Sequence, residues 1–174
     1  MAARCATRFT AAHPYVRLRV TVAPPAELAR LLRARTLDLV VAEAGALVNV
    51  DDLEVLESLE PLPAFIVTRA GHPLATRKAV ELADVLDYPY AQVQSLAPRV
   101  LQPMLASRRR PATSRAEPLL PFPSLECPTA RFALDVVAAT DAFTFASLGM
   151  IQGELERGKL VPVLQPPWLR AEWA

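Results

Sequence analysis

Proline, rather than glycine, sets where the segments of this chain end. Seventeen of the 174 residues are proline and five are glycine, so the proline share is about twice the usual one. Proline interrupts strands and helix interiors but is tolerated at the start of a helix. The prolines therefore divide the chain into short segments, and strand-like and helix-like segments alternate twice along it. This alternation predicts an α/β fold in two lobes.

The first part of the chain has a strand, helix, strand pattern. Apolar and polar side chains alternate over Val16–Val22, which is typical of a strand with one wet face. Leucines at helical spacing follow Pro25, and Leu37–Val41 is predicted to be a more buried strand. Together these segments indicate one βαβ unit. Leu53–Leu59 is a further strand candidate.

The remainder of the chain repeats the alternation with shorter segments. Strands are predicted at Ala64–Thr68, Ala91–Val93, Ala142–Ala146 and Leu160–Leu164. Helices are predicted over 79–86, after Pro98, after Pro128 and after the N-cap candidate Ser147. Gly71-His72-Pro73 indicates a turn, and the prolines between 111 and 128 predict extended chain.

Composition and charge exclude several classes of protein. A hydrophobic content of 52% with 21% charged residues excludes a disordered tail. A formal net charge of +1 is not that of a polybasic nucleic-acid-binding protein. The apolar runs are shorter than the roughly 20 residues of a membrane span. No charged leader precedes an apolar stretch, so we expect a cytoplasmic protein that does not contact a membrane.

The residues needed for catalysis or cofactor binding form no recognisable pattern. Cys5 and Cys127 have no Cys or His at metal-ligand spacing, and no glycine-rich phosphate-binding motif occurs. We therefore expect neither a metal nor a cofactor. A triad of Ser95, His72 and Asp141 remains an open alternative, although Ser95 lacks the Gly-x-Ser-x-Gly elbow of hydrolases. The balance favours a ligand receptor over an enzyme.

Several short motifs follow one another in the order and spacing of a known family. They are the helix tail and strand Arg8–Val20, the helix Glu27–Leu32, the Leu-Asp-Leu strand at 37–41, the His-Pro-Leu turn at 71–75, Leu82-Ala83-Asp84, and Tyr88-Pro89-Tyr90. With these motifs, the chain resembles the effector-binding domain of the LysR-type transcriptional regulators along nearly its whole length.

The resemblance implies a two-lobed fold like that of the type II periplasmic binding proteins. In that fold two crossing strands join two α/β lobes, and a small molecule binds in the cleft between them. On this template lobe one is residues 1–88 plus 164–174, and lobe two is residues 89–163. The family's helix-turn-helix, its linker helix and parts of lobe one have no counterpart here. We therefore expect a domain truncated at both ends with lobe one incomplete, which contacts DNA only through a helix-turn-helix region absent from this chain.

The resemblance also implies where the ligand binds. Residues 94–96 lie between a strand and the next helix, where backbone N–H groups and a hydroxyl can hold an anion. An arginine facing them would suit a carboxylate. The expected ligand-binding residues are Arg69, Gln94, Ser95, Leu96, Ser124, Leu125, Phe143 and Thr144. The expected partner is a small-molecule effector such as an organic acid.

Members of the family pair their effector domains side by side. The resemblance therefore implies a homodimer or higher oligomer, with Val16–Val22 and Leu148–Leu155 as the contact surfaces. In the incomplete lobe, Leu37–Val41 is expected to present an exposed strand edge. Two other functions remain open: a transport-type solute-binding protein of the same fold and a small α/β hydrolase.

Overall fold

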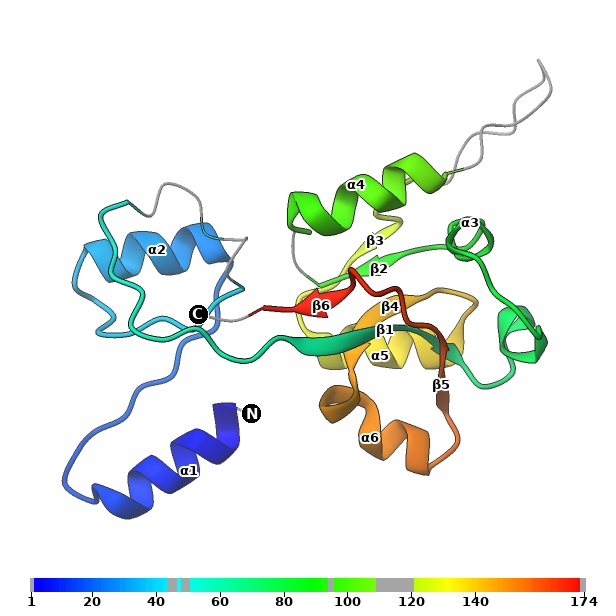
Figure 1. The fold of residues 1–174 in the computed structure, drawn as a ribbon. Coiled ribbons are helices and arrows are strands. Elements are labelled where there is room, and N and C mark those ends of the chain that lie inside the picture. Colours follow the sequence, from blue (N-terminus) through cyan, green and yellow to red (C-terminus); the bar gives the residue numbers. More distant parts are fainter. Residues whose placement is uncertain (1, 44–46, 48–50, 94–95, 109–120, 173–174) are drawn as a thin grey trace. The chain divides into compact units, whose positions relative to one another are not determined.

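The computed structural model describes residues 2–43, 47, 51–93, 96–108 and 121–172. The chain divides into two compact units, residues 1–40 and residues 41–174, and each is described by itself. Figure 1 shows their helices and strands.

The unit of residues 1–40 contains two helices. Helix α1 spans Ala2–Ala12 and helix α2 spans Pro25–Arg33. The prediction of a helix after the proline pair is confirmed, because Pro25 occupies a position in the first turn, where its missing N–H is not needed. Ala29 faces inward and is 3% exposed.

Three predicted strands are wrong, and the predicted βαβ unit is therefore not formed. Val16–Val22, Leu37–Val41 and Leu53–Leu59 are chain without regular structure. A strand is stable only when its backbone N–H and C=O groups bond to a neighbour, and these segments pair with no strand among the described residues. Val20 and Val22 are 63% and 91% exposed, so the alternating apolar side chains form no buried face that would stabilise a strand. The strand edge expected at Leu37–Val41 is wrong for the same reason.

The unit of residues 41–174 is built on one sheet whose central strand is β1 (Leu62–Arg69). Strand β1 pairs antiparallel with β4 (Thr144–Ser147) on one side and β5 (Leu160–Leu164) on the other. The short β6 (Arg170–Ala171) pairs with Leu62 and Pro63 at the beginning of β1. The strands predicted near residues 64, 142 and 160 are thus confirmed.

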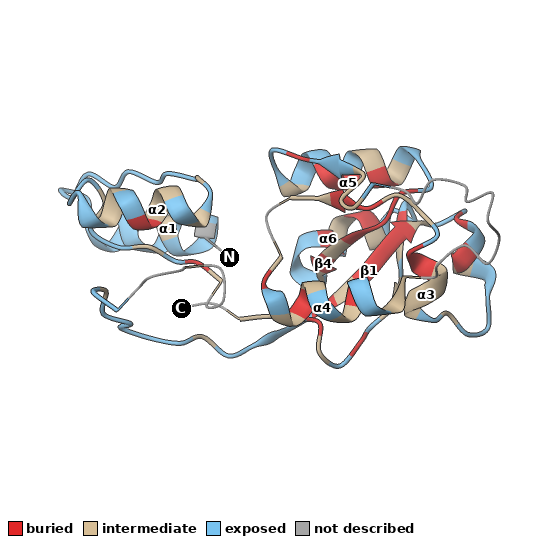
Figure 2. Ribbon diagram, turned by 90° about the horizontal axis from the view of Figure 1, so that it is seen from above, coloured by how far each residue is buried: buried red, intermediate tan, exposed pale blue. Residues whose placement is uncertain are grey.

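Helices cover both faces of this sheet. Ile66 and Val67 are adjacent in β1, point to opposite faces and are both 0% exposed. Ile66 belongs to the cluster formed with α3 (Leu82–Val85) and α4 (Pro98–Ser107). Val67 belongs to the cluster formed with α5 (Ala130–Ala139) and α6 (Leu148–Glu156). The α/β prediction is confirmed, as are the four predicted helices of this unit, and Figure 2 shows the buried strand between the helices.

Short elements connect these layers. The turn predicted at Gly71–Pro73 is confirmed and leads into the 3-10 helix η1 (Pro73–Thr76). Strand β2 (Ala91–Gln92) pairs in parallel with β3 (Leu125–Glu126), and Tyr90 forms a bridge with Phe143. Strand β1 precedes the predicted lobe boundary at residue 88 and pairs with β4 and β5, which follow it. Within the described ranges, no helix has the length and apolar character needed to cross a membrane.

Candidate functional site

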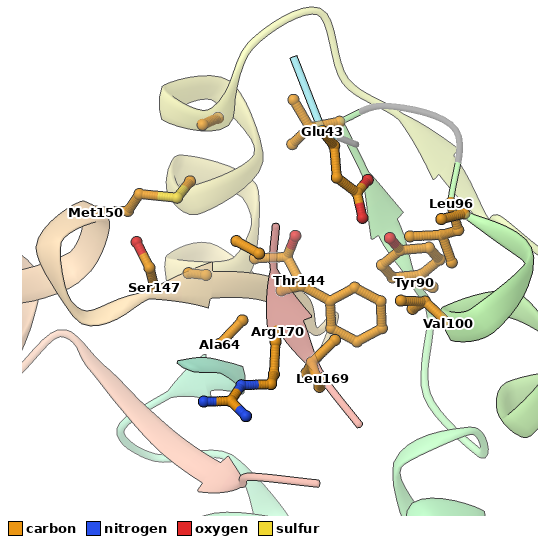
Figure 3. A pocket seen from close by; sticks show the side chains of 16 residues that line it. Glu43, Ala64, Tyr90, Leu96, Val100, Thr144, Ser147, Met150, Leu169 and Arg170 are labelled. Carbon is orange, nitrogen blue, oxygen red and sulfur yellow. The ribbon is translucent and has the colours of Figure 1, made fainter. Parts of the chain in front are cut away.

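A pocket of about 260 Å³ opens in the unit of residues 41–174. Figure 3 shows it from close by. Its apolar lining residues are Ala64, Val93, Leu96, Ala97, Val100, Ala130, Phe145, Ala146, Met150, Leu169 and Ala171, and its polar ones are Glu43, Tyr90, Thr144, Ser147 and Arg170. A mainly apolar wall with a few placed polar groups is the usual character of a small-molecule site.

Three helices begin at the wall of this pocket. Ala97 and Ser147 directly precede α4 and α6, and Ala130 is the first residue of α5. The first N–H groups of a helix have no partner within the helix and carry partial positive charge, so they favour an anion. Neither Ala97 nor Ser147 caps its helix with a side-chain hydrogen bond, whereas Thr129 accepts one from the Phe132 N–H at 3.2 Å.

The lining residue Glu43 forms an ion pair with Arg99. The Arg99 Nη2 lies 2.5 Å from Glu43 Oε1 and donates to the Arg170 carbonyl oxygen at 3.0 Å. Its Nε lies 3.5 Å from Glu172 Oε2. One guanidinium on α4 therefore holds residue 43 and residues 170–172 against this helix, and it offsets the charge of the Glu43 carboxylate that lines the pocket.

Two of the predicted ligand-binding residues line the pocket. Leu96 is half-buried just before α4, and Thr144 is 2% exposed at the start of β4. The Thr144 hydroxyl donates to the Ala91 carbonyl oxygen at 2.7 Å, which ties β4 to β2. Predicted residues Gln94 and Ser95 lie outside the described residues.

Two other predicted residues bind neighbouring groups of the protein. The Arg69 guanidinium is paired with the Asp141 carboxylate, with an Nη2–Oδ1 distance of 2.7 Å. The Ser124 hydroxyl donates to the Pro121 carbonyl oxygen at 2.7 Å and accepts the Tyr90 N–H at 3.3 Å. Both side chains therefore stabilise local structure, and neither is a lining residue of the pocket.

The last two predicted residues are apolar. Phe143 is 0% exposed and packs in the core cluster on the α4 face of the sheet. Leu125 lies in β3 and is 39% exposed. Neither is among the lining residues of the pocket.

No sequence pattern indicated that Glu43, Tyr90 and Arg170 would line the pocket. Tyr90 was visible only as part of the Tyr-Pro-Tyr break after a helix. Glu43 and Arg170 meet Tyr90 only through the fold, because they lie far apart in sequence. No local sequence pattern indicates that residues so far apart in the chain lie close together.

His72 is not arranged as the base of a hydrolase triad. Its Nδ1 accepts the Leu74 N–H at 3.0 Å, and its Nε2 lies 3.1 Å from the Asp141 backbone carbonyl oxygen. Burial lowers the pKa of the imidazole, and the hydrogen bond and charge of Asp141 oppose this only in part. A triad needs a carboxylate to orient the imidazole, whereas the Asp141 carboxylate is paired with Arg69.

The cysteines are separate, and no metal cluster is found in the described part of the chain. Cys5 is exposed on α1 and Cys127 is buried beside the sheet, each with a free thiol. Over these same residues, no three His, Cys, Asp or Glu side chains are grouped so that they could hold a metal ion.

The family model of the LysR substrate binding domain matches residues 2–174. The chain is also 30% identical over 171 residues to the SDS degradation transcriptional activation protein of Pseudomonas sp. (strain ATCC 19151). That alignment covers 97% of this chain and 52% of the relative, so the chain spans about half the length of the curated relative it matches.

Solved structures agree on the fold. The regulatory domain of Synechocystis PCC6803 CcmR in complex with 2-PG superposes with a TM-score of 0.68 at 14% identity, covering 99% of this chain and 78% of that chain. The reduced regulatory domain of OxyR2 from Vibrio vulnificus gives a TM-score of 0.67 at 15% identity, covering 99% and 77%. The predicted type II periplasmic-binding-protein-like fold is thereby confirmed. The chain belongs to the family of LysR substrate binding domains, and it is an effector-sensing domain of the kind found in transcription regulators.

Proposed function

We propose that the effector of this domain is a small organic acid and that it binds in the pocket of residues 41–174. The observation that carries the proposal is a mainly apolar pocket at whose wall three helices begin. Its volume of about 260 Å³ lies just below the range of roughly 300–1,000 Å³ in which drug-sized ligands bind. The effector is therefore small.

The charges around the pocket favour an acid. The helix beginnings at Ala97, Ala130 and Ser147 supply partial positive charge, and Arg170 adds a guanidinium. Glu43 is the lining residue of opposite sign, and its carboxylate is paired with Arg99. An apolar body would contact the aliphatic wall while a carboxylate lies near the helix beginnings.

The predicted contacts enter this proposal in different ways. Leu96 and Thr144 line the pocket and are proposed as ligand contacts. Gln94 and Ser95 remain predictions, because they lie outside the described residues. Arg69, Ser124, Leu125 and Phe143 remain predictions whose side chains make the protein contacts described above.

The wider role is also a proposal. We infer that the domain acts in the cytoplasm within a transcription regulator, without catalysis, as its family and the name of the Pseudomonas relative support. The lobes are proposed as residues 1–88 with 164–174 and residues 89–163, and the oligomer as a homodimer or higher. Contact with DNA is proposed to take place through a helix-turn-helix region and not through the substrate binding domain of residues 2–174.

Thermal unfolding in the presence of organic acids, aromatic acids and amino acids tests the proposal. A ligand that binds only the folded state raises the unfolding temperature by mass action. We expect at least one acid to do so, and Ala130→Trp, which fills the pocket, to abolish the rise. Ala139→Trp, at the exposed end of the same helix, is the matched control and should keep it. A rise that survives Ala130→Trp would contradict the proposed site.

A further inference from the structure

The Tyr90 side chain is buried at the pocket with its hydroxyl unused. Tyr90 is 3% exposed and is one of the lining residues. None of the residues that the structure describes forms a hydrogen bond with the hydroxyl. Figure 3 shows this oxygen on the side of the ring that faces the Glu43 carboxylate. The hydroxyl is not among the fully buried polar atoms without a partner in the described residues, so it retains accessible surface although the residue as a whole is buried, and a ligand in the pocket could reach it.

The rest of Tyr90 is held by the fold. Its backbone N–H donates to the Ser124 hydroxyl at 3.3 Å, and its carbonyl oxygen accepts the N–H groups of Ser124 and Leu125 at 3.0 and 3.1 Å. Its ring lies among phenylalanines, with centroid distances of 5.2 Å to Phe122 and 5.1 Å to both Phe143 and Phe145. The ring therefore has little freedom to carry its hydroxyl elsewhere.

Packing alone would be served equally well by phenylalanine at this position. Three neighbours of the ring are phenylalanines, and the hydroxyl adds no hydrogen bond within the described residues. Burial also raises the pKa of Tyr90 well above its ordinary value, so the phenol keeps its proton and remains a donor. The hydroxyl is thus a fixed, neutral donor at the wall of the pocket.

Few other groups in the pocket have a proton to give. The Thr144 proton is directed to the Ala91 carbonyl oxygen, and the Glu43 carboxylate, which accepts from Arg99, has none. Ser147 is half-buried and Arg170 is exposed, so both have more contact with water than Tyr90. Among the described lining residues, Tyr90 is thus the buried donor whose proton is not directed to a protein acceptor.

We propose that the Tyr90 hydroxyl donates a hydrogen bond to an oxygen of the bound effector. The inference rests on the proposed function and narrows its ligand class to molecules with an apolar body and an acceptor oxygen at that end. A carboxylate and an alcohol both supply such an oxygen, so an experiment must separate them. Ligands that share the body but lack the oxygen should gain nothing from Tyr90.

The test uses three probes with one apolar body: toluene, benzyl alcohol and benzoate. Their affinities are measured by NMR titration of the whole chain and of the Tyr90→Phe variant. The variant should bind benzyl alcohol or benzoate, whichever the chain binds, about threefold to tenfold more weakly, which is the usual effect of losing one hydrogen bond. Its affinity for toluene should not change. If benzyl alcohol is the probe that loses affinity, the acceptor is an alcohol oxygen; if benzoate is, the acceptor is a carboxylate oxygen.

Tyr88→Phe is the matched control, because it removes a nearby hydroxyl that does not line the pocket. It should leave all three affinities unchanged.

Tyr90→Phe without ligand should keep its unfolding temperature, because no described partner is lost. A fall in that temperature with an equal loss for all three probes would show a structural role and overturn the inference. Equal affinities of Tyr90→Phe and the unaltered chain would also overturn it while leaving the proposed pocket standing. No binding of any probe to the unaltered chain would contradict the proposed function itself.

Discussion

At the scale of single residues, His72 and Tyr90 are two buried aromatic side chains with opposite hydrogen bonding. Both ring nitrogens of His72 bond to backbone groups, of Leu74 and Asp141, whereas the Tyr90 hydroxyl faces the pocket. The sequence indicated a turn around His72 because a residue before proline avoids helical backbone. It did not indicate that the other ring nitrogen lies against the Asp141 carbonyl oxygen, because that residue is 69 positions away.

The hydrogen bonding of His72 predicts a pH dependence of stability. Because Nδ1 accepts an N–H, the neutral ring is the form that the fold binds, and burial lowers its pKa below the ordinary value of about 6.5. As the pH falls below that value, the unfolded chain takes up a proton that the folded chain does not. The unfolding temperature should therefore fall between about pH 7 and pH 5. His72→Gln should lessen this fall.

The exposed His13 provides the control for this measurement. His13→Gln should keep the pH dependence of the unaltered chain, because His13 is exposed on the other unit. At about pH 8 the His72→Gln variant should itself be less stable by about 1–3 kcal/mol, since buried backbone groups lose their partner. An unchanged slope in His72→Gln would contradict the assignment.

At the scale of elements, the periodicity of apolar residues predicted helices and strands correctly where a neighbouring element covers the apolar face. The strands around Val67 and Leu160 and the helices after Pro98, Pro128 and Ser147 are present, because each buries an apolar face in one of two core clusters. Val16–Val22 has an equally clear alternation and is not a strand. The pattern describes which face would be buried, but it contains no information on whether a partner strand is there.

The helix N-caps allow a matched prediction. Thr129→Ala removes the side-chain cap of α5 and should lower the unfolding free energy by about 1 kcal/mol. Ser147→Ala, at the same position of α6, removes no such bond and should change it by less than about 0.5 kcal/mol. Chemical denaturation measures both. Equal losses would contradict the cap assignment.

At the scale of the whole molecule, the fold class was predictable and most of the site was not. Leu96 and Thr144, which line the pocket, were predicted from the positions that the family resemblance assigns to ligand contacts. Glu43, Tyr90 and Arg170 were missed because the pocket joins residues from distant parts of the chain. The family resemblance predicted the fold. Side-chain pairs such as Arg69 and Asp141 could not be predicted from the sequence, because the fold brings together residues that are distant in the chain.

Hydrogen exchange should show which residues form the stable unit. Amides of β1 should exchange as slowly as those of β5, because β1 is paired on both sides and Ile66 and Val67 are 0% exposed. Residues 1–40 should exchange faster, since Ala29 is the one buried residue among those described there. Exchange of the β1 amides as fast as that of residues 1–40 would contradict the assignment of β1 as the central, doubly paired strand.

Binding of the effector in the pocket of residues 41–174 is tested most directly through the methionine methyl groups. Met150 lines the pocket, and Met104 is 0% exposed in the core and is not a lining residue. Carbon-13 methyl spectra are recorded while the acid that most raises the unfolding temperature is added. Binding in the pocket should give a saturating shift of the Met150 signal with little change at Met104. Saturation of the binding with the Met150 signal unmoved would contradict it.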